Sequence, residues 1–142
     1  MITNLLDNQI FVFGSNLSGR HGKGAALQAV KFGAKYGVGI GRTGQCYAIP
    51  TKGFNLEVLK LEVIKQHVEV FLDYVQSNSQ LEFLLTPIGC GLAGCDSNQI
   101  APMFNRQYEN LILPVEFKNA LLWAFSFLFI INHAMVSSFD GN

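Results

Sequence analysis

A glycine loop between a hydrophobic run and a stretch of small residues is the part of this chain best suited to binding chemistry. It extends from Ile10 to Ala26 and reads IFVFGSNLSGRHGKGAA. Glycine lets a ligand approach the backbone, and a helix N-terminus offers unpaired N–H groups, so a strand, loop and helix in this order suit a phosphate group. For this loop alone, a tight turn that only reverses the chain is an equally open interpretation.

A second stretch of the same kind runs over 86–96 and reads TPIGCGLAGCD. It follows an apolar run at 81–85 that is typical of a buried central strand, and we expect a helix over 97–108 after it. Parallel strands joined by helices have their carboxyl ends at one edge of the sheet, so the two loops should be neighbours there. Two adjacent loops of this kind suit a diphosphate, and the pair is a more specific signal than either loop alone.

Lys52 is a third candidate, because it comes at the end of a predicted strand. Residues 45–49 read as that strand, and Pro50 keeps the chain extended beyond it. Thr51 and Lys52 should therefore lie where α/β sheets bind their ligands. On its own, a lysine at such a position is more often an ordinary surface residue.

The rest of the pattern supplies the elements that hold these residues. Apolar spacing predicts a helix over 24–34, a long amphipathic helix over 55–76 with Asn55 as its N-cap, and a further strand over 110–114. We interpret His67, within the long helix, as a structural residue. Strands that alternate with helices indicate an α/β fold with parallel strands.

One apparent motif is misleading. Residues 39–44 read GIGRTG and match the dinucleotide fingerprint G-x-G-x-x-G letter for letter. That fingerprint needs a strand before the glycines and a helix after them, whereas here a helix precedes and a strand follows. We interpret the segment as a flexible connection or a lid near the binding loops.

Length and composition favour one domain with a small ligand. The 142 residues carry ten basic and ten acidic side chains, so charge predicts no affinity for free nucleic acid and no membrane partner. The three cysteines, Cys46, Cys90 and Cys95, show neither disulfide-framework nor zinc-ligand spacing. The start of the chain lacks the pattern of a signal peptide. We therefore expect a cytoplasmic protein with no metal and no cofactor.

Three stretches in this order resemble the macrodomain superfamily: GSNLSGRHGKGAALQAVKFGAKYG, YAIPTK and TPIGCGLAGCD. The resemblance covers residues 10–114 and is strongest to the subclass of terminal ADP-ribose protein glycohydrolase and of antitoxins that remove ADP-ribose from DNA. It implies a three-layer α/β/α fold, a mixed sheet with helices on both faces. It also implies a partner, either ADP-ribose or an ADP-ribosylated macromolecule.

The resemblance places the ligand as well. Asn16 would be within reach of the distal ribose. In macrodomains a preceding strand carries an acidic residue that binds adenine. That strand has no clear counterpart here, and Asp7 is the only acidic residue before Ile10. The diphosphate would lie between the first loop and the second, at Gly22, Lys23, Gly24, Ala25, Gly89, Cys90, Gly91, Leu92, Ala93 and Gly94.

In catalytic members of the family a lysine and an aspartate act on the anomeric carbon, and by position these roles fall on Lys52 and Asp96. A lysine made partly neutral by burial could attack that carbon and form a covalent intermediate, while a carboxylate moves the proton. Asp96 is equally well placed to N-cap the helix after it, and one residue can do both.

Two functions stay open at this stage. One is an enzyme that hydrolyses an ADP-ribosyl linkage, and the other is a non-catalytic module that binds ADP-ribose or a related nucleotide for sensing or sequestration. A domain kept only for an interaction surface is a third reading, which the intact glycine loops oppose.

The domain predicted over 1–114 is followed by a hydrophobic extension over 115–142. Residues 120–131 are apolar apart from Ser126. This run is shorter than the ~20 residues of a membrane-spanning helix. We expect it to pack on the domain or to mediate self-association. A membrane-touching anchor and a sequence unrelated to the domain, such as one from a shifted reading frame, are the alternatives.

Overall fold

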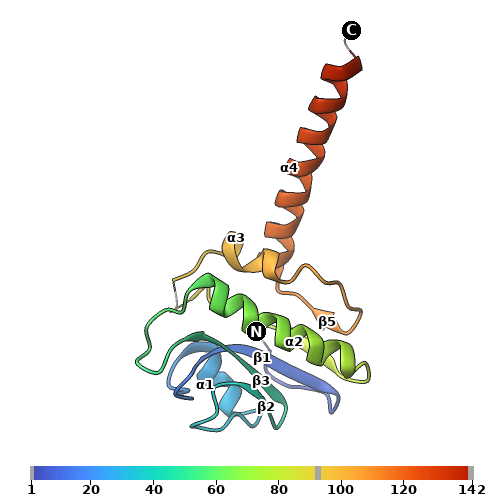
Figure 1. The fold of residues 1–142 in the computed structure, drawn as a ribbon. Helices are drawn as coiled ribbons and strands as arrows, with labels where there is room; N and C mark the ends of the chain where they lie inside the picture. Colours follow the sequence, from blue (N-terminus) through green and yellow to red (C-terminus); the bar gives the residue numbers. More distant parts are fainter. Residues whose placement is uncertain (1, 92–93, 141–142) are drawn as a thin grey trace.

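The computed structural model of the chain describes residues 2–91 and 94–140, and it is an α/β fold (Figure 1). In chain order the elements are β1 (Gln9–Asn16), α1 (Gly24–Val30), β2 (Gly41–Thr43), β3 (Cys46–Lys52), α2 (Leu61–Ser77), β4 (Glu82–Leu85), α3 (Ser97–Ile100), the 3-10 helix η1 (Ala101–Met103), β5 (Leu111–Ile112) and α4 (Val115–Asp140).

The strands form one mixed sheet in the order β2-β3-β1-β4-β5. β1 pairs in parallel with β3 on one side and with β4 on the other, and β4 pairs in parallel with β5. Only the edge strand β2, among the described strands, runs antiparallel to its neighbour. The two glycine loops therefore leave adjacent parallel strands at the same edge of the sheet, which confirms the expected juxtaposition.

Side chains of β1 alternate between two apolar clusters on opposite faces of the sheet, as the pleat requires. Phe11 and Phe13 pack with Ala29 of α1, whose small residues allow the helix to approach closely. Ile10 and Val12 instead belong to the larger cluster, which includes the buried residues of α2, α3 and η1. The helices thus cover both faces of the central strand and hold its carboxyl end in place.

The long helix α2 begins later than its apolar spacing predicts. It starts at Leu61 with Lys60 at the N-cap position, so the predicted cap at Asn55 is wrong. The backbone N–H of Asn55 donates instead to the carboxylate of Glu57, 2.9 Å away. This contact stabilises a turn, because an N–H that bonds to a nearby side chain competes with the start of a helix.

The chain between β3 and α2 folds back along the end of the strand. Lys52 forms an antiparallel bridge with Val58, and the Gly53 N–H donates to the Glu57 carbonyl. Leu56 within this turn has a φ of 63°, which is rare for a leucine and incompatible with a helix. The turn places Leu56 beside Lys52, at the edge of the sheet where the glycine loops lie.

Two other predicted helices are shorter than expected. α1 ends at Val30 rather than 34, and the chain turns at Gly33, where φ is 112°. α3 ends at Ile100 and continues only as η1, so the helix predicted over 97–108 is wrong in its second half. Pro102 explains this end, because it has no N–H for the next helical hydrogen bond.

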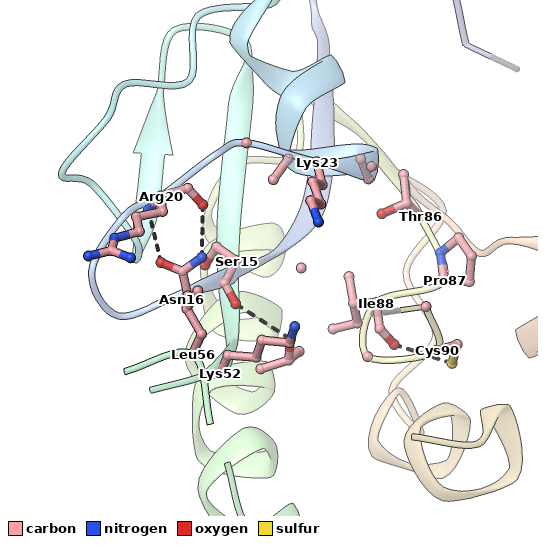
Figure 2. Close-up of a pocket in the computed structure, with 18 of the residues that line it drawn as sticks. Ser15, Asn16, Arg20, Lys23, Lys52, Leu56, Thr86, Pro87, Ile88 and Cys90 are labelled. Carbon is pink, nitrogen blue, oxygen red and sulfur yellow. Dashed lines mark hydrogen bonds between the residues drawn. The ribbon is translucent and has the colours of Figure 1, made fainter. Parts of the chain in front are cut away.

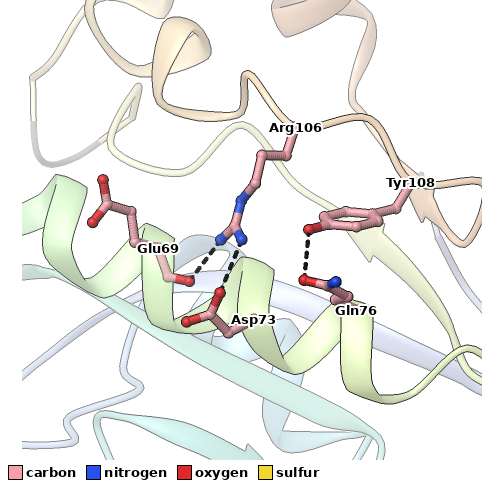
Figure 3. Close-up of polar contacts among 5 residues, drawn as sticks. All are labelled: Glu69, Asp73, Gln76, Arg106 and Tyr108. Atoms are coloured by element: carbon pink, nitrogen blue, oxygen red, sulfur yellow. Dashed lines mark hydrogen bonds and ion pairs between the residues drawn. The ribbon is translucent and has the colours of Figure 1, made fainter.

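Polar side chains hold the segment after η1 on the surface of α2 (Figure 3). Arg106 donates to the Asp73 carboxylate over 2.9 Å and to the Glu69 carbonyl over 3.0 Å, and the Tyr108 hydroxyl lies 3.2 Å from the Gln76 amide oxygen. The contacts are largely exposed, so each contributes little on its own. Together they hold residues 106–108 against α2 just before the chain enters β5.

The segment that mimics a dinucleotide fingerprint contains β2, which pairs antiparallel with β3. No helix follows its glycines, in agreement with the rejection of that motif. Gly39 packs against the end of β1, where a Cβ would stand 2.0 Å from the Asn16 carbonyl oxygen. The Ser15 hydroxyl also donates to the Gly39 carbonyl. The segment therefore contains an ordered strand beside β3 and contacts the end of β1, while its flexibility and a part as a lid stay predictions.

The C-terminal extension forms α4, which begins at Val115 and projects away from the rest of the fold (Figure 1). Its first turns belong to the core, since Phe117 is fully buried with Phe104, and Ala120 and Leu121 pack against the same cluster. Leu122 and Ile130, farther along, are exposed. Within the described residues, no helix is long and apolar enough to cross a membrane. Self-association through α4 stays a prediction.

Candidate ligand-binding site

A cavity of about 780 Å³ opens at the carboxyl edge of the sheet, between the two glycine loops and the end of β3 (Figure 2). Its volume is within the range of small-molecule sites. It brings together most of the predicted site residues: Asn16, Gly22, Lys23, Gly24, Ala25, Lys52, Gly89, Cys90 and Gly91. Gly94 and Asp96 do not line it, and Leu92 and Ala93 lie outside the described residues.

Asn16 organises the first loop. Its amide oxygen accepts hydrogen bonds from the Arg20 N–H over 2.9 Å and from the Ser18 hydroxyl over 2.7 Å. Its amide nitrogen donates to the Arg20 carbonyl over 2.8 Å. An amide nitrogen carries two protons, so one N–H of Asn16 remains for a ligand.

His21 also fixes this loop, although no pattern in the sequence separates it from an ordinary loop residue. Its ring is fully buried, with Nε2 2.9 Å from the Lys35 carbonyl and its edge against Phe13. The Tyr36 hydroxyl donates to the His21 carbonyl over 3.1 Å. Because a carbonyl only accepts, Nε2 carries the proton, and Nδ1 has no partner within the described residues. These contacts attach the loop to the segment before β2.

Gly22 and Gly91 leave open space at the cavity. A Cβ added to either would meet no described atom within 4 Å, and neither residue has a φ in the left-handed region. Gly24 and Gly89 differ, because their φ angles of 58° and 75° favour glycine by themselves. Neither backbone conformation nor packing within the described residues requires glycine at 22 and 91. A ligand that approaches the backbone at these two positions would require it.

Two lysine side chains enter the cavity from opposite sides (Figure 2). Lys23 reaches in from the residue before α1, and Lys52 reaches in from the end of β3. Neither ammonium group has a hydrogen-bond or ion-pair partner among the described residues. Arg20 also lines the cavity, but its guanidinium points away from it. The two lysines are therefore free to pair with an anion.

Backbone donors add to these charges. Within the described part of the chain, the N–H groups of Gly22, Lys23, Gly24 and Ala25 have no acceptor. The same holds in the second loop for Gly89 and Gly91. Successive unpaired N–H groups in a loop form a concave surface that favours anions. Both walls of the cavity thus offer donors.

Cys90 lines the cavity from the second loop, and its thiol is half-buried. The thiol lies 3.4 Å from the Ile88 carbonyl and accepts from the Ser97 hydroxyl over 3.5 Å. Burial raises the pKa of the Cys90 thiol above its ordinary value. The thiol is therefore protonated at neutral pH, which disfavours a role as nucleophile.

Asp96 is the N-cap of α3. Its carboxylate accepts from the Asn98 N–H over 2.8 Å, and its own N–H donates to the Gln99 side chain over 3.2 Å, which completes a capping box. Its side chain is exposed and does not line the cavity. The capping interpretation is confirmed, whereas a part in proton transfer stays a prediction.

Glu116 is the carboxylate that does line the cavity, and the sequence reasoning missed it. It lies in the first turn of α4, at the start of what reads as an apolar extension. No pattern in the sequence connects this position with the loops, because the contact depends on how α4 packs against α3. The described residues contain no group of three or more His, Cys, Asp and Glu side chains that could hold a metal ion.

Comparisons with known proteins add no relative, since no family model, curated protein or solved structure matches the chain.

Proposed function

We propose that this chain is a macrodomain-like protein that binds ADP-ribose in the cavity between its glycine loops. The observation that carries the proposal is the open space at Gly22 and Gly91, which face one cavity from two loops and need not be glycine for the fold of the described residues. A diphosphate between the loops explains both glycines. Helices on both faces of the mixed sheet are compatible with a three-layer macrodomain-like arrangement.

Charge supports a diphosphate as the central group of the ligand. Lys23 and Lys52 bring two positive charges without partners among the described residues, and both loops bring unpaired N–H groups. Hydrogen bonds from charged groups to phosphate oxygens are among the strongest in proteins. The free N–H of Asn16 is suited to a ribose hydroxyl at the end of β1.

The proposed reaction is hydrolysis of an ADP-ribosyl linkage through Lys52. Lys52 first gives its ammonium proton to solvent; its amine then attacks the anomeric carbon, the glycosidic bond breaks, and the leaving group takes up the proton that the attacking nitrogen releases. Water then attacks the same carbon, which releases ADP-ribose and restores the amine. The acceptor that carried the ADP-ribose is a protein or a nucleic acid, and the cytoplasm is its expected location.

A non-catalytic binder is the second candidate, and the position of Asp96 favours it. The carboxylate that the family resemblance assigns to proton transfer caps α3 and does not line the cavity. Without a proton donor at the leaving group, the cavity would hold ADP-ribose and not cleave its linkage. Sensing or sequestration of the nucleotide would then be the function.

Calorimetric titration with ADP-ribose tests binding directly, with AMP and NAD as comparison ligands. We expect saturable binding of ADP-ribose that is tighter than that of AMP, because AMP lacks the diphosphate and the distal ribose. Release of ADP-ribose from ADP-ribosylated protein and DNA then separates the enzyme from the binder. Absence of binding to ADP-ribose would refute both candidates.

A further inference from the structure

Two cysteines of the second glycine loop, Cys90 and Cys95, lie close together at the base of a turn. The Cys95 N–H donates to the Gly89 carbonyl over 2.7 Å, and a Cβ added to Gly89 would lie 3.7 Å from the Cys95 Cβ. Cys90 follows Gly89 directly, so the planar peptide between them and this hydrogen bond keep the Cα atoms of the two cysteines within about 7 Å. A disulfide can join cysteines at this separation without backbone movement.

The side chains of these two cysteines also lie on the same side of the sheet. Both are free thiols that pack against the larger apolar cluster, and both are partly exposed, so a small solute can reach them. Burial is the main cause of the raised pKa of the Cys90 thiol, and the nearby Cys95 thiol adds to it. Cys46 is fully buried in the smaller cluster on the opposite face. Cys90 can therefore pair with Cys95 and not with Cys46.

We propose that Cys90 and Cys95 form a reversible disulfide, which fixes the second loop in the conformation that binds the diphosphate of the ligand. The disulfide itself does not depend on the ligand, whereas its effect on binding rests on the proposed function. Cys90 and Gly91 line the cavity, and the Gly91 N–H has no acceptor among the described residues. A disulfide restricts the backbone of the residues that it encloses, so this donor is in place before the ligand arrives.

The oxidant is a small disulfide, such as oxidised glutathione. The Cys95 thiol gives its proton to solvent, and its sulfur attacks one sulfur of the small disulfide, whose S–S bond breaks and releases one small thiolate. Cys90 reacts second, because burial keeps its thiol protonated. After losing its proton, the Cys90 sulfur attacks the Cys95 sulfur in the mixed disulfide and releases the second small thiolate. Each released thiolate takes up a proton, so the two cysteines are oxidised and the small disulfide is reduced to two thiols. In a reducing cytoplasm such a pair stays reduced until small disulfides accumulate, as in a redox sensor.

Mass spectrometry of the full chain after incubation with oxidised glutathione tests the disulfide, with no ligand present. We expect a mass loss of about 2 Da, from the hydrogen atoms of two thiols, and no attached glutathione. Trypsin without prior reduction should assign the loss to the peptide 66–106, which contains both cysteines and no internal Lys or Arg. Cys46→Ala should give the same result, whereas Cys90→Ser should stop at a mixed disulfide on Cys95. Unreacted thiols, glutathione retained on the unaltered protein or a disulfide between two chains would each overturn the inference.

Calorimetric titration with ADP-ribose then measures the effect of the disulfide on the cavity. The oxidised protein should bind about tenfold more tightly than the reduced protein, the gain from fixing the backbone of one residue before binding. Cys95→Ser is the matched control and should show no such gain after the same treatment, and thermal unfolding should show that it remains folded. Equal or weaker binding by the oxidised protein would overturn the effect on the loop. Failure of the proposed function has a different signature, since the disulfide would form and neither the oxidised nor the reduced protein would bind ADP-ribose.

Discussion

Lys52 lies opposite Asn16 at the carboxyl ends of two parallel strands, and a shift in register brings it there. Ser15 pairs with Pro50, but the next residue of β1, Asn16, pairs with Lys52 and skips Thr51. Thr51 is buried, and its hydroxyl lies 3.4 Å from the Ser15 carbonyl. Bulges of this kind often redirect a side chain near a functional site. Here the irregularity leaves the Lys52 side chain in the cavity (Figure 2).

Lys52→Ala tests the proposed nucleophile. We expect turnover of an ADP-ribosylated substrate to disappear, because alanine has no amine to attack the anomeric carbon. ADP-ribose affinity should change by only a few fold, since Lys23 and the loop N–H groups remain. Lys65→Ala, on the exposed side of α2, is the control and should behave like the unaltered protein. Retained turnover in Lys52→Ala would refute the lysine mechanism.

Gly91→Val tests the phosphate position. Valine should abolish binding of ADP-ribose, because its branched side chain would occupy the space that the phosphates need. The fold should tolerate the change, as no described atom lies within 4 Å of the added Cβ and φ is not in the left-handed region. We expect the free energy of unfolding to stay within about 0.5 kcal/mol, the usual effect of a surface substitution. Calorimetry and denaturant unfolding give the two readings, and undiminished affinity would exclude the proposed phosphate site.

His21→Phe tests how the first loop is held. Phenylalanine keeps an aromatic ring beside Phe13 but cannot donate to the Lys35 carbonyl. The Lys35 carbonyl still accepts from the Val38 N–H, so the variant loses the net contribution of one hydrogen bond, and the free energy of unfolding should fall by about 1 kcal/mol. ADP-ribose affinity should fall as well, because the loop loses an attachment beside Gly22. Urea unfolding and calorimetry measure the two effects, and unchanged values would show that the ring only fills space.

The sequence predicted the parts of the site that depend on local order along the chain. Each glycine loop follows a hydrophobic strand, and this order sufficed to predict that the loops meet at one edge of a parallel sheet. The start of α2 was predicted wrongly because the turn at Leu56 rests on backbone contacts with Gly53 and on a bridge to Lys52. Such contacts leave no periodic pattern in the sequence.

The residues that reasoning from the sequence missed depend on tertiary contacts. His21 is structural because Lys35 and Tyr36, far along the chain, surround it. Glu116 lines the cavity because Phe117, beside it, packs into the core and draws the first turn of α4 onto the domain. Neither position belongs to a motif, so only the packed structure reveals them.

Stability at high pH should depend on Cys46. Burial raises the pKa of this thiol to about 11, against an ordinary value of 9.0. Between these two values the unfolded chain loses the thiol proton while the folded chain keeps it, so the free energy of unfolding falls as pH rises from 9 to 11. Below pH 9 the thiol is protonated in both states, so it has no effect on the pH dependence of the free energy of unfolding. Urea unfolding of Cys46→Ala over this range should show a smaller decline, and equal declines in the two proteins would contradict the assignment.

Two substitutions separate the capping role of Asp96 from a role in proton transfer. Asp96→Ala should lower the free energy of unfolding by about 1 kcal/mol, because the Asn98 N–H loses its acceptor. Asp96→Asn should keep that hydrogen bond and nearly all of the stability, since asparagine is as good an N-cap as aspartate, but an amide cannot transfer the proton. Comparison of denaturant unfolding with turnover in both variants separates the roles. Full turnover in a stable Asp96→Asn variant would show that Asp96 acts only as the N-cap. Loss of turnover with the helix intact would support the proton-transfer role that the family resemblance implies.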